Sequence, residues 1–170
     1  MRRTAFKKRQ HGFTLIEVLV ATLVLMIGLV AAAQLVPNAV RMNSDNRADS
    51  TELVVAQSYV NQFVQQPLSN ATYADAAGNN CTISGAAGAF SGNPVVAFGN
   101  SLVINFGGAP VAGYSLTYSD PNDPAGIWFD VRWAVYTLAG SSGKRFIVGV
   151  RRLGGNAPLL PVNLDAMVGK

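Results

Sequence analysis

The sequence predicts an α+β fold, in which one long N-terminal helix precedes a head of antiparallel strands. Three patterns in the chain of 170 residues carry this prediction. An apolar run covers 13–36, an apolar stripe with helical spacing follows it, and apolar residues alternate with other residues after position 126. We therefore expect a leader at 1–12, a membrane helix at 13–37, an amphipathic helix at 38–66 and a β-rich head at 67–170.

The apolar run is long enough to cross a membrane. At about 1.5 Å per residue, a helix over 13–36 would span a hydrocarbon core of about 30 Å. Pro37 follows at once, so the helix should kink or restart there. The flank before the run is basic and no acid precedes Glu17. We expect the N-terminus to stay in the cytoplasm and the head to lie outside.

The positive charge of the chain belongs to its first residues. The formal net charge is +4, from 13 basic and nine acidic residues. Five of the basic residues are Arg2, Arg3, Lys7, Lys8 and Arg9. Without 1–12, eight basic and nine acidic residues remain, a net charge of −1. The rest of the chain therefore offers no general basic field for nucleic acid.

Neither a simple signal peptide nor a simple membrane anchor explains why Glu17 lies within the apolar run. A charge at the centre of a membrane helix costs roughly 2.5 to 3.5 kcal/mol on insertion scales. One alternative is a secretory signal peptide, cut after the alanines at 31–33 so that a secreted soluble chain starts at Gln34. Another is an uncut signal anchor. Neither gains anything from the carboxylate.

The stretch G-F-T-L-I-E-V-L-V-A at 12–21, preceded by basic residues, resembles the class III leader of type IV prepilins and type II secretion pseudopilins. The resemblance implies that a prepilin peptidase cleaves after Gly12 and methylates the new N-terminal Phe13. It also implies that Glu17 pairs with the Phe13 amine of a neighbouring subunit. Two buried opposite charges offset much of the cost that either would carry alone.

The same resemblance implies the fold and the role. The fold would be type IV pilin-like, and the final hairpin is most like that of PilV-type minor pilins. Implied partners are the peptidase, other pilin subunits and an inner-membrane assembly platform. We expect a minor type IV pilin that supports assembly, adhesion, motility or DNA uptake. The alternatives are a minor pseudopilin of a type II secretion system and a DNA-binding tip pilin of a competence pilus.

The second helical stretch has an apolar stripe and a charged surface. The stripe is Leu53, Ala56, Val60, Phe63 and Val64. The charged residues before it should form a solvated face, and Pro67 should end the helix. These charged residues are Arg41, Asp45, Arg47, Asp49 and Glu52.

The strand signal is clearest near the end of the chain. Alternate residues from Ile127 to Val135 are apolar, as are Phe146, Val148 and Val150. Period 2 on both sides of the turn at 140–143 predicts an antiparallel hairpin over about 127–152. Its inner face should cover the amphipathic helix. Between 68 and 113 the composition favours loops, with short strands expected only around 102–104 and 114–118.

Two surface features are weaker candidates for binding. The loop residues Asp120, Asn122 and Asp123 could ligate calcium through oxygen, but the same residues and prolines also make ordinary turns. The cations around the last hairpin strand could bind DNA or could protect a strand edge. These cations are Lys144, Arg145, Arg151 and Arg152.

Catalysis is not expected. His11 is the only histidine and lies in the leader, and Cys81 is the only cysteine. No nucleophile elbow, zinc-protease motif or phosphate loop is present in the sequence. We expect a protein that is not an enzyme and that needs no cofactor or metal. A single cysteine also excludes an intrachain disulfide.

Overall fold

A computed structural model describes residues 12–120, 126–140, 143–154 and 160–169. The chain divides into two compact units, Met1–Ser44 and Asp45–Lys170. The second unit, the head, contains the end of the long helix and all the described strands. The expected α+β fold, one long N-terminal helix and a head of antiparallel strands, is confirmed.

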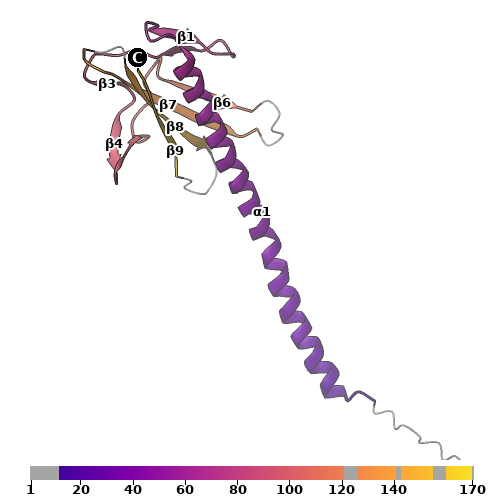
Figure 1. Cartoon of the computed structure of the whole chain (residues 1–170). Coiled ribbons are helices and arrows are strands. Elements are labelled where there is room, and N and C mark those ends of the chain that lie inside the picture. The colour runs from indigo at the N-terminus through magenta and orange to yellow at the C-terminus, as the bar shows by residue number, and fades with distance from the viewer. Residues whose placement is uncertain (1–11, 121–125, 141–142, 155–159, 170) are drawn as a thin grey trace, which may run out of the picture. The chain divides into compact units, whose positions relative to one another are not determined.

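The helix α1 spans Leu15–Gln65 (Figure 1). It continues through Pro37, so of the two outcomes expected there the helix does not end and restart. It ends two residues before Pro67, where a further turn would be disfavoured. The two helical stretches expected on either side of Pro37 are therefore parts of one helix.

The expected apolar stripe is only partly right. Leu53 and Val64 are exposed, at 41% and 37% of their surface, whereas Glu52 is completely buried. Ala56 and Phe63 of the expected stripe are buried, and Val60 packs against the core. The buried face of α1 also includes residues outside that stripe, namely Ala48, Glu52, Val55 and Tyr59. The sequence pattern missed these residues because a glutamate and a tyrosine are among them.

The strands follow α1 as short pieces and then as long ones. Their bounds are β1 Thr72–Ala74, β2 Asn80–Thr82, β3 Phe90–Gly92, β4 Val95–Phe98, β5 Ser101–Ile104, β6 Ser115–Ser119, β7 Trp128–Thr137, β8 Lys144–Leu153 and β9 Val162–Val168. β5, β6 and the hairpin of β7 with β8 were expected from the sequence. β1 to β4 were not, because strands of three or four residues give little periodic signal. The seven-residue β9 was not expected either.

The main sheet has five antiparallel strands. The order is β3-β7-β8-β9, and β6 also pairs with β7. β7 and β8 pair along their whole length, from Trp128 opposite Leu153 to Thr137 opposite Lys144. β6 lies beside the first half of β7, and β3 lies beside the second half. β1 with β2 and β4 with β5 form separate two-stranded sheets.

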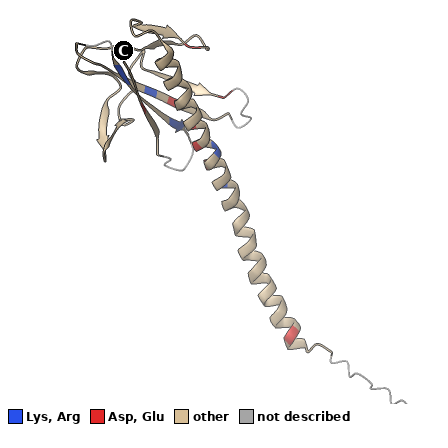
Figure 2. Cartoon of the chain, viewed as in Figure 1, with Lys and Arg blue, Asp and Glu red and all other residues tan. Residues whose placement is uncertain are grey.

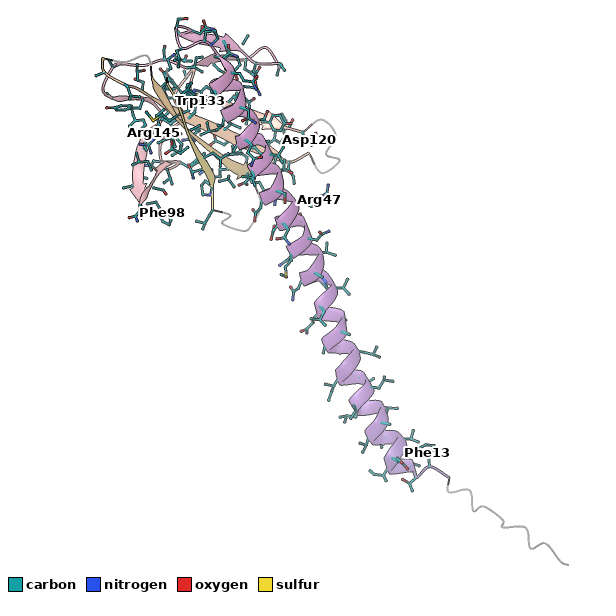
Figure 3. The ribbon with its side chains drawn as sticks, in the orientation of Figure 1. Phe13, Arg47, Phe98, Asp120, Trp133 and Arg145 are labelled. Atoms are coloured by element: carbon teal, nitrogen blue, oxygen red, sulfur yellow. The ribbon has the colours of Figure 1, made fainter. Side chains whose placement is uncertain are left out.

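The inner face of the main sheet packs against the head part of α1. Alternate residues of β7 and β8 point into this core, as the sequence predicted. They are Phe129, Val131, Trp133, Val135, Phe146, Val148 and Val150. Trp133 is central (Figure 3): its ring stacks on Tyr59 at 6.5 Å, and its Nε1–H donates to the Thr82 carbonyl at 2.8 Å.

The outer face of the sheet is covered in part by β5. Ile104 packs on Ala134 and Ile147 in a second, smaller core. A Cβ at Gly149 would lie 2.9 Å from the Ile104 Cβ, so glycine permits this close approach. The Ile104 N–H also donates to Asn163 Oδ1 at 2.9 Å.

Candidate functional site

The residues expected to be processed lie just before α1. Gly12 and Phe13 are outside the helix and exposed, and 83% of the Phe13 surface is accessible (Figure 3). A peptidase needs an accessible bond, and the Gly12–Phe13 bond is exposed and outside regular secondary structure. Gly12 has nothing within 4 Å of its Cβ position, so it is not required there by packing.

Thr14 caps the start of α1. Its Oγ1 accepts a hydrogen bond from the Glu17 N–H at 3.3 Å, and its carbonyl accepts from the Glu17 and Val18 N–H groups. Thr14 and Glu17 thus have the residue types and spacing of a capping box. The sequence analysis considered only the charge of Glu17 and did not anticipate that Thr14 caps the Glu17 N–H.

Glu17 lies in the first turn of α1, where the helix dipole favours a negative charge. It lines a groove of about 320 Å³ along one face of the helix, together with Phe13, Val18, Ala21, Thr22 and Leu25. The groove is almost wholly apolar apart from Glu17 and Thr22. One carboxylate therefore lies on an apolar helix surface, close to the residue expected to become the N-terminus.

The first unit presents an apolar surface along its helix. Among the residues that the structure describes, α1 is the one helix long and apolar enough to span a membrane, and that apolar segment is not buried. Lys, Arg, Asp and Glu are almost absent from it (Figure 2). A single N-terminal apolar helix of this kind suggests a single-pass membrane anchor.

The four cations of the last hairpin do not form one cluster. Lys144 and Arg152 occupy alternate positions on the inner side of β8, whereas Arg145 and Arg151 lie on the outer side. Lys144 is buried and its Nζ donates to the Asn70 carbonyl at 2.8 Å. Its pKa is lowered by burial. A single basic patch would need all four on one exposed face.

The three arginines of that set are in ion pairs. Arg145 pairs with Asp165 across β8 and β9, and Arg152 lies 3.6 Å from Asp45. Arg151 donates to Asp130 at 3.1 Å. These pairs are typical of a charged sheet surface in which the charges are locally balanced.

The structure includes only part of the expected calcium loop. Asp120 is partly buried just after β6. Asn122 and Asp123 lie outside the described residues. Within the described ranges, no group of three or more His, Cys, Asp or Glu side chains could hold a metal ion.

Three acids of the described part of the head are buried, which the sequence did not predict: Glu52, Asp75 and Asp130. Glu52 accepts a hydrogen bond from the Arg152 N–H at 2.9 Å, and its Oε2 is buried without a hydrogen-bond partner in the described part of the chain. Burial raises the pKa of Glu52 to about 7, opposed in part by that hydrogen bond. The charged residues of the helix were expected to form a solvated face, and Arg41, Arg47 and Asp49 are exposed as expected. Glu52 is the exception, because the tertiary packing buries it.

Asp75 is the second of these buried acids. It accepts hydrogen bonds from the Tyr59 hydroxyl at 3.0 Å, from the Asn79 side chain and from the N–H groups of Ala77 and Asn79. Burial opposes the charged form, but these hydrogen bonds outweigh it and lower the pKa of Asp75. Through the hydrogen bond from Tyr59, Asp75 links the β1–β2 loop to α1.

Cys81 is buried in the main core. Burial, and to a lesser extent the charge of Asp75, raises the pKa of its thiol to about 11. A thiol in this environment is protonated at neutral pH and poorly reactive.

Comparison with known protein families gives one match, to the prokaryotic N-terminal methylation motif, over residues 7–33. No curated protein and no solved structure matches the chain. The matched segment contains the exposed Gly12–Phe13 bond, the Thr14 cap and Glu17. Such a motif implies processing by prepilin peptidase and assembly with other pilin-type subunits. Residues 7–33 are therefore a prepilin-type N-terminal methylation motif, consistent with the class III leader of type IV pilins and pseudopilins.

Proposed function

We propose that this chain is a minor type IV pilin of the PilV type, without enzymatic activity. It is inserted with its N-terminus in the cytoplasm, cleaved after Gly12 and methylated on Phe13. It then enters a pilus, with the head on the periplasmic or outer side, and supports pilus assembly and pilus-dependent adhesion, motility or DNA uptake. The observation that carries this proposal is the exposed Gly12–Phe13 bond immediately before a capped apolar helix.

Glu17 has the role of pairing with a neighbouring subunit in this proposal. Cleavage creates a cationic amine on Phe13, and the amine of one subunit meets the Glu17 carboxylate of the next. In the apolar surroundings of the groove, each charge alone would be costly and the pair offsets much of that cost. The pairing therefore favours a filament over separate subunits.

The first experiment is mass spectrometry of the N-terminus of the protein purified from its native membrane. The proposal expects a chain that begins at methylated Phe13. A chain that begins at Gln34 would place Glu17 in a discarded signal peptide, and an uncut chain would leave a simple anchor. Either of these results would refute the filament proposal.

A pilus and a type II secretion filament differ in what the loss of the protein abolishes. The proposal expects that deletion of the gene reduces surface pili and pilus-dependent motility and leaves protein secretion intact. The reverse outcome would identify a minor pseudopilin. The DNA-binding alternative has less support, because the four cations that suggested it lie on two faces of β8.

A further inference from the structure

A second site lies in the head, on the outer face of the main sheet. A pocket of about 460 Å³ opens there over β6, β7 and β8. Its charged and hydroxyl-bearing lining consists of Ser115, Thr117, Asp130, Arg132 and Arg151. All five belong to the head, so the pocket does not depend on the N-terminal unit.

The register of the sheet brings these side chains together. Thr117 is opposite Asp130, and Asp130 is opposite Arg151, so the three form one row across β6, β7 and β8. The next row contains Ser115 and Arg132. Opposed residues in adjacent strands lie close enough for their side chains to interact. β7 and β8 thus place basic and acidic residues side by side (Figure 2).

Arg132 by itself satisfies Asp130. Its Nε–H donates to both carboxylate oxygens at 3.0 Å, and its Nη2 lies 2.9 Å from Oδ2. Its Nη1 donates to the Gly108 carbonyl at 2.7 Å. Only 4% of the Arg132 side chain is exposed. This arginine is therefore a fixed, buried partner with little capacity for a ligand.

Arg151 is different. It makes one hydrogen bond to Asp130, from Nη2 at 3.1 Å, and 35% of its side chain is exposed. Both guanidinium groups lie over the Phe106 ring, at 5.1 Å for Arg132 and 4.8 Å for Arg151. The ring restricts their orientation. With two cations and one anion, the group carries a net charge of +1, and the partly exposed Arg151, which lines the pocket, has further N–H donors besides the one that binds Asp130.

We propose that this pocket binds a carboxylate of a polypeptide, with Arg151 as the principal donor and with Thr117 lining the pocket on the other side of Asp130. The planar fork of arginine matches a carboxylate in a bidentate arrangement. The net charge of +1 suits a monoanion, whereas the fixed carboxylate of Asp130 would repel a phosphate dianion more strongly. Pro110 and Leu153 supply apolar walls. The volume exceeds that of a carboxylate alone, so adjoining peptide atoms fit as well.

The test uses the full chain in an uncharged detergent, with isotope-labelled arginine so that the Nε–H signals of Arg132 and Arg151 are resolved by NMR. One pair of probes is a capped Gly-Leu-Glu peptide and its Gly-Leu-Gln analogue. A second pair is a Gly-Leu-Leu peptide with a free or an amidated C-terminus. These pairs distinguish a side-chain carboxylate from a terminal one. We expect at least one acid to shift the Arg151 signal, with a Kd of about 1 mM, and its neutral analogue to leave it unchanged.

Variants and a competing anion complete the test. Arg151→Gln should weaken binding at least about tenfold, and Arg151→Lys should weaken it less. Arg145→Gln is the matched control, because it removes a paired arginine from the same outer side of β8, away from the pocket. The proposal is overturned if neither acid shifts the signal, if Arg151→Gln binds as the unchanged chain does, or if inorganic phosphate binds more tightly than both acids.

Discussion

At the scale of single residues, two glutamates of one helix have opposite surroundings. Glu17 lies on an exposed apolar surface in the first turn of α1, where the backbone and the dipole favour its charge. Glu52 is completely buried against β8, where desolvation disfavours its charge. Glutamate therefore suits subunit pairing at position 17, whereas at position 52 it makes the stability of the head depend on pH.

Replacement of Glu17 separates its charge from its capping role. Glu17→Gln retains the residue types of a capping box but loses the charge, whereas Glu17→Ala loses both. We expect both variants to be cleaved after Gly12 and both to enter filaments at least about tenfold less than the unchanged chain, as the loss of a buried charge pair predicts. Quantitative blotting of purified filaments measures this. Normal incorporation of Glu17→Gln would show that the charge is not required.

Glu52 should make the stability of the head depend on pH. A carboxyl with a pKa of about 7 when folded and about 4.5 when unfolded binds its proton more tightly in the folded state. The free energy of unfolding should therefore fall as pH rises from about 4.5 to about 7, by about 2 to 3 kcal/mol, and then level off. Denaturant melts across this range should show the fall.

Glu52→Gln should flatten that dependence, because the amide cannot ionise and keeps an oxygen for the Arg152 N–H. Asp49→Asn, an exposed acid one turn earlier in α1, should leave most of it in place. A persistent slope in Glu52→Gln would assign the effect to another group. Below about pH 4 the free energy of unfolding should instead fall as pH falls. Asp75 has a lowered pKa in the folded state, so its stabilising charge is lost when it is protonated there.

At the scale of elements, glycine decides how β5 covers the sheet. β5 crosses the outer face over Gly149, where a side chain would meet both Ile104 and Asn163. The small outer core of Ile104, Ala134 and Ile147 depends on this approach. A strand glycine, which normally weakens a sheet, is thus required here by a neighbouring element.

Gly149→Ala should lower the free energy of unfolding by about 1 to 3 kcal/mol, the usual cost of overpacking. Its Cβ would lie 2.9 Å from both the Ile104 Cβ and Asn163 Oδ1. Gly108→Ala is the control, because nothing lies within 4 Å of that Cβ position. Thermal melts of the two variants measure the difference. If both variants are equally stable, β5 can shift away from the main sheet without lowering the free energy of unfolding.

At the scale of the whole molecule, the chain combines two units whose surfaces differ in polarity. The helix surface of Met1–Ser44 is apolar and exposed, whereas Asp45–Lys170 has its own core and seven basic against eight acidic residues. The head core includes the last turns of α1, through Val55, Tyr59 and Phe63. The boundary of the folded head therefore lies within α1 and not at its end.

A fragment of residues 45–170 should fold alone as a soluble monomer with one cooperative melting transition. A fragment of residues 68–170 lacks the helix and exposes the inner face of the sheet, including Trp133 and Phe146. We expect this shorter fragment to aggregate. Size-exclusion chromatography and circular dichroism melts compare them. Aggregation of the longer fragment, or a folded shorter one, would contradict this division.

The sequence by itself determined the N-terminal methylation motif, the membrane-length helix and the hairpin of β7 with β8. Each depends on local order along the chain: a contiguous motif over 7–33, a continuous apolar run, and strict period 2. Only the tertiary structure decided which face of α1 is buried, that Glu52 lies inside, and that Arg132 and Arg151 meet at Asp130. These features depend on strand register and on contacts between residues far apart in the chain, which local periodicity does not contain.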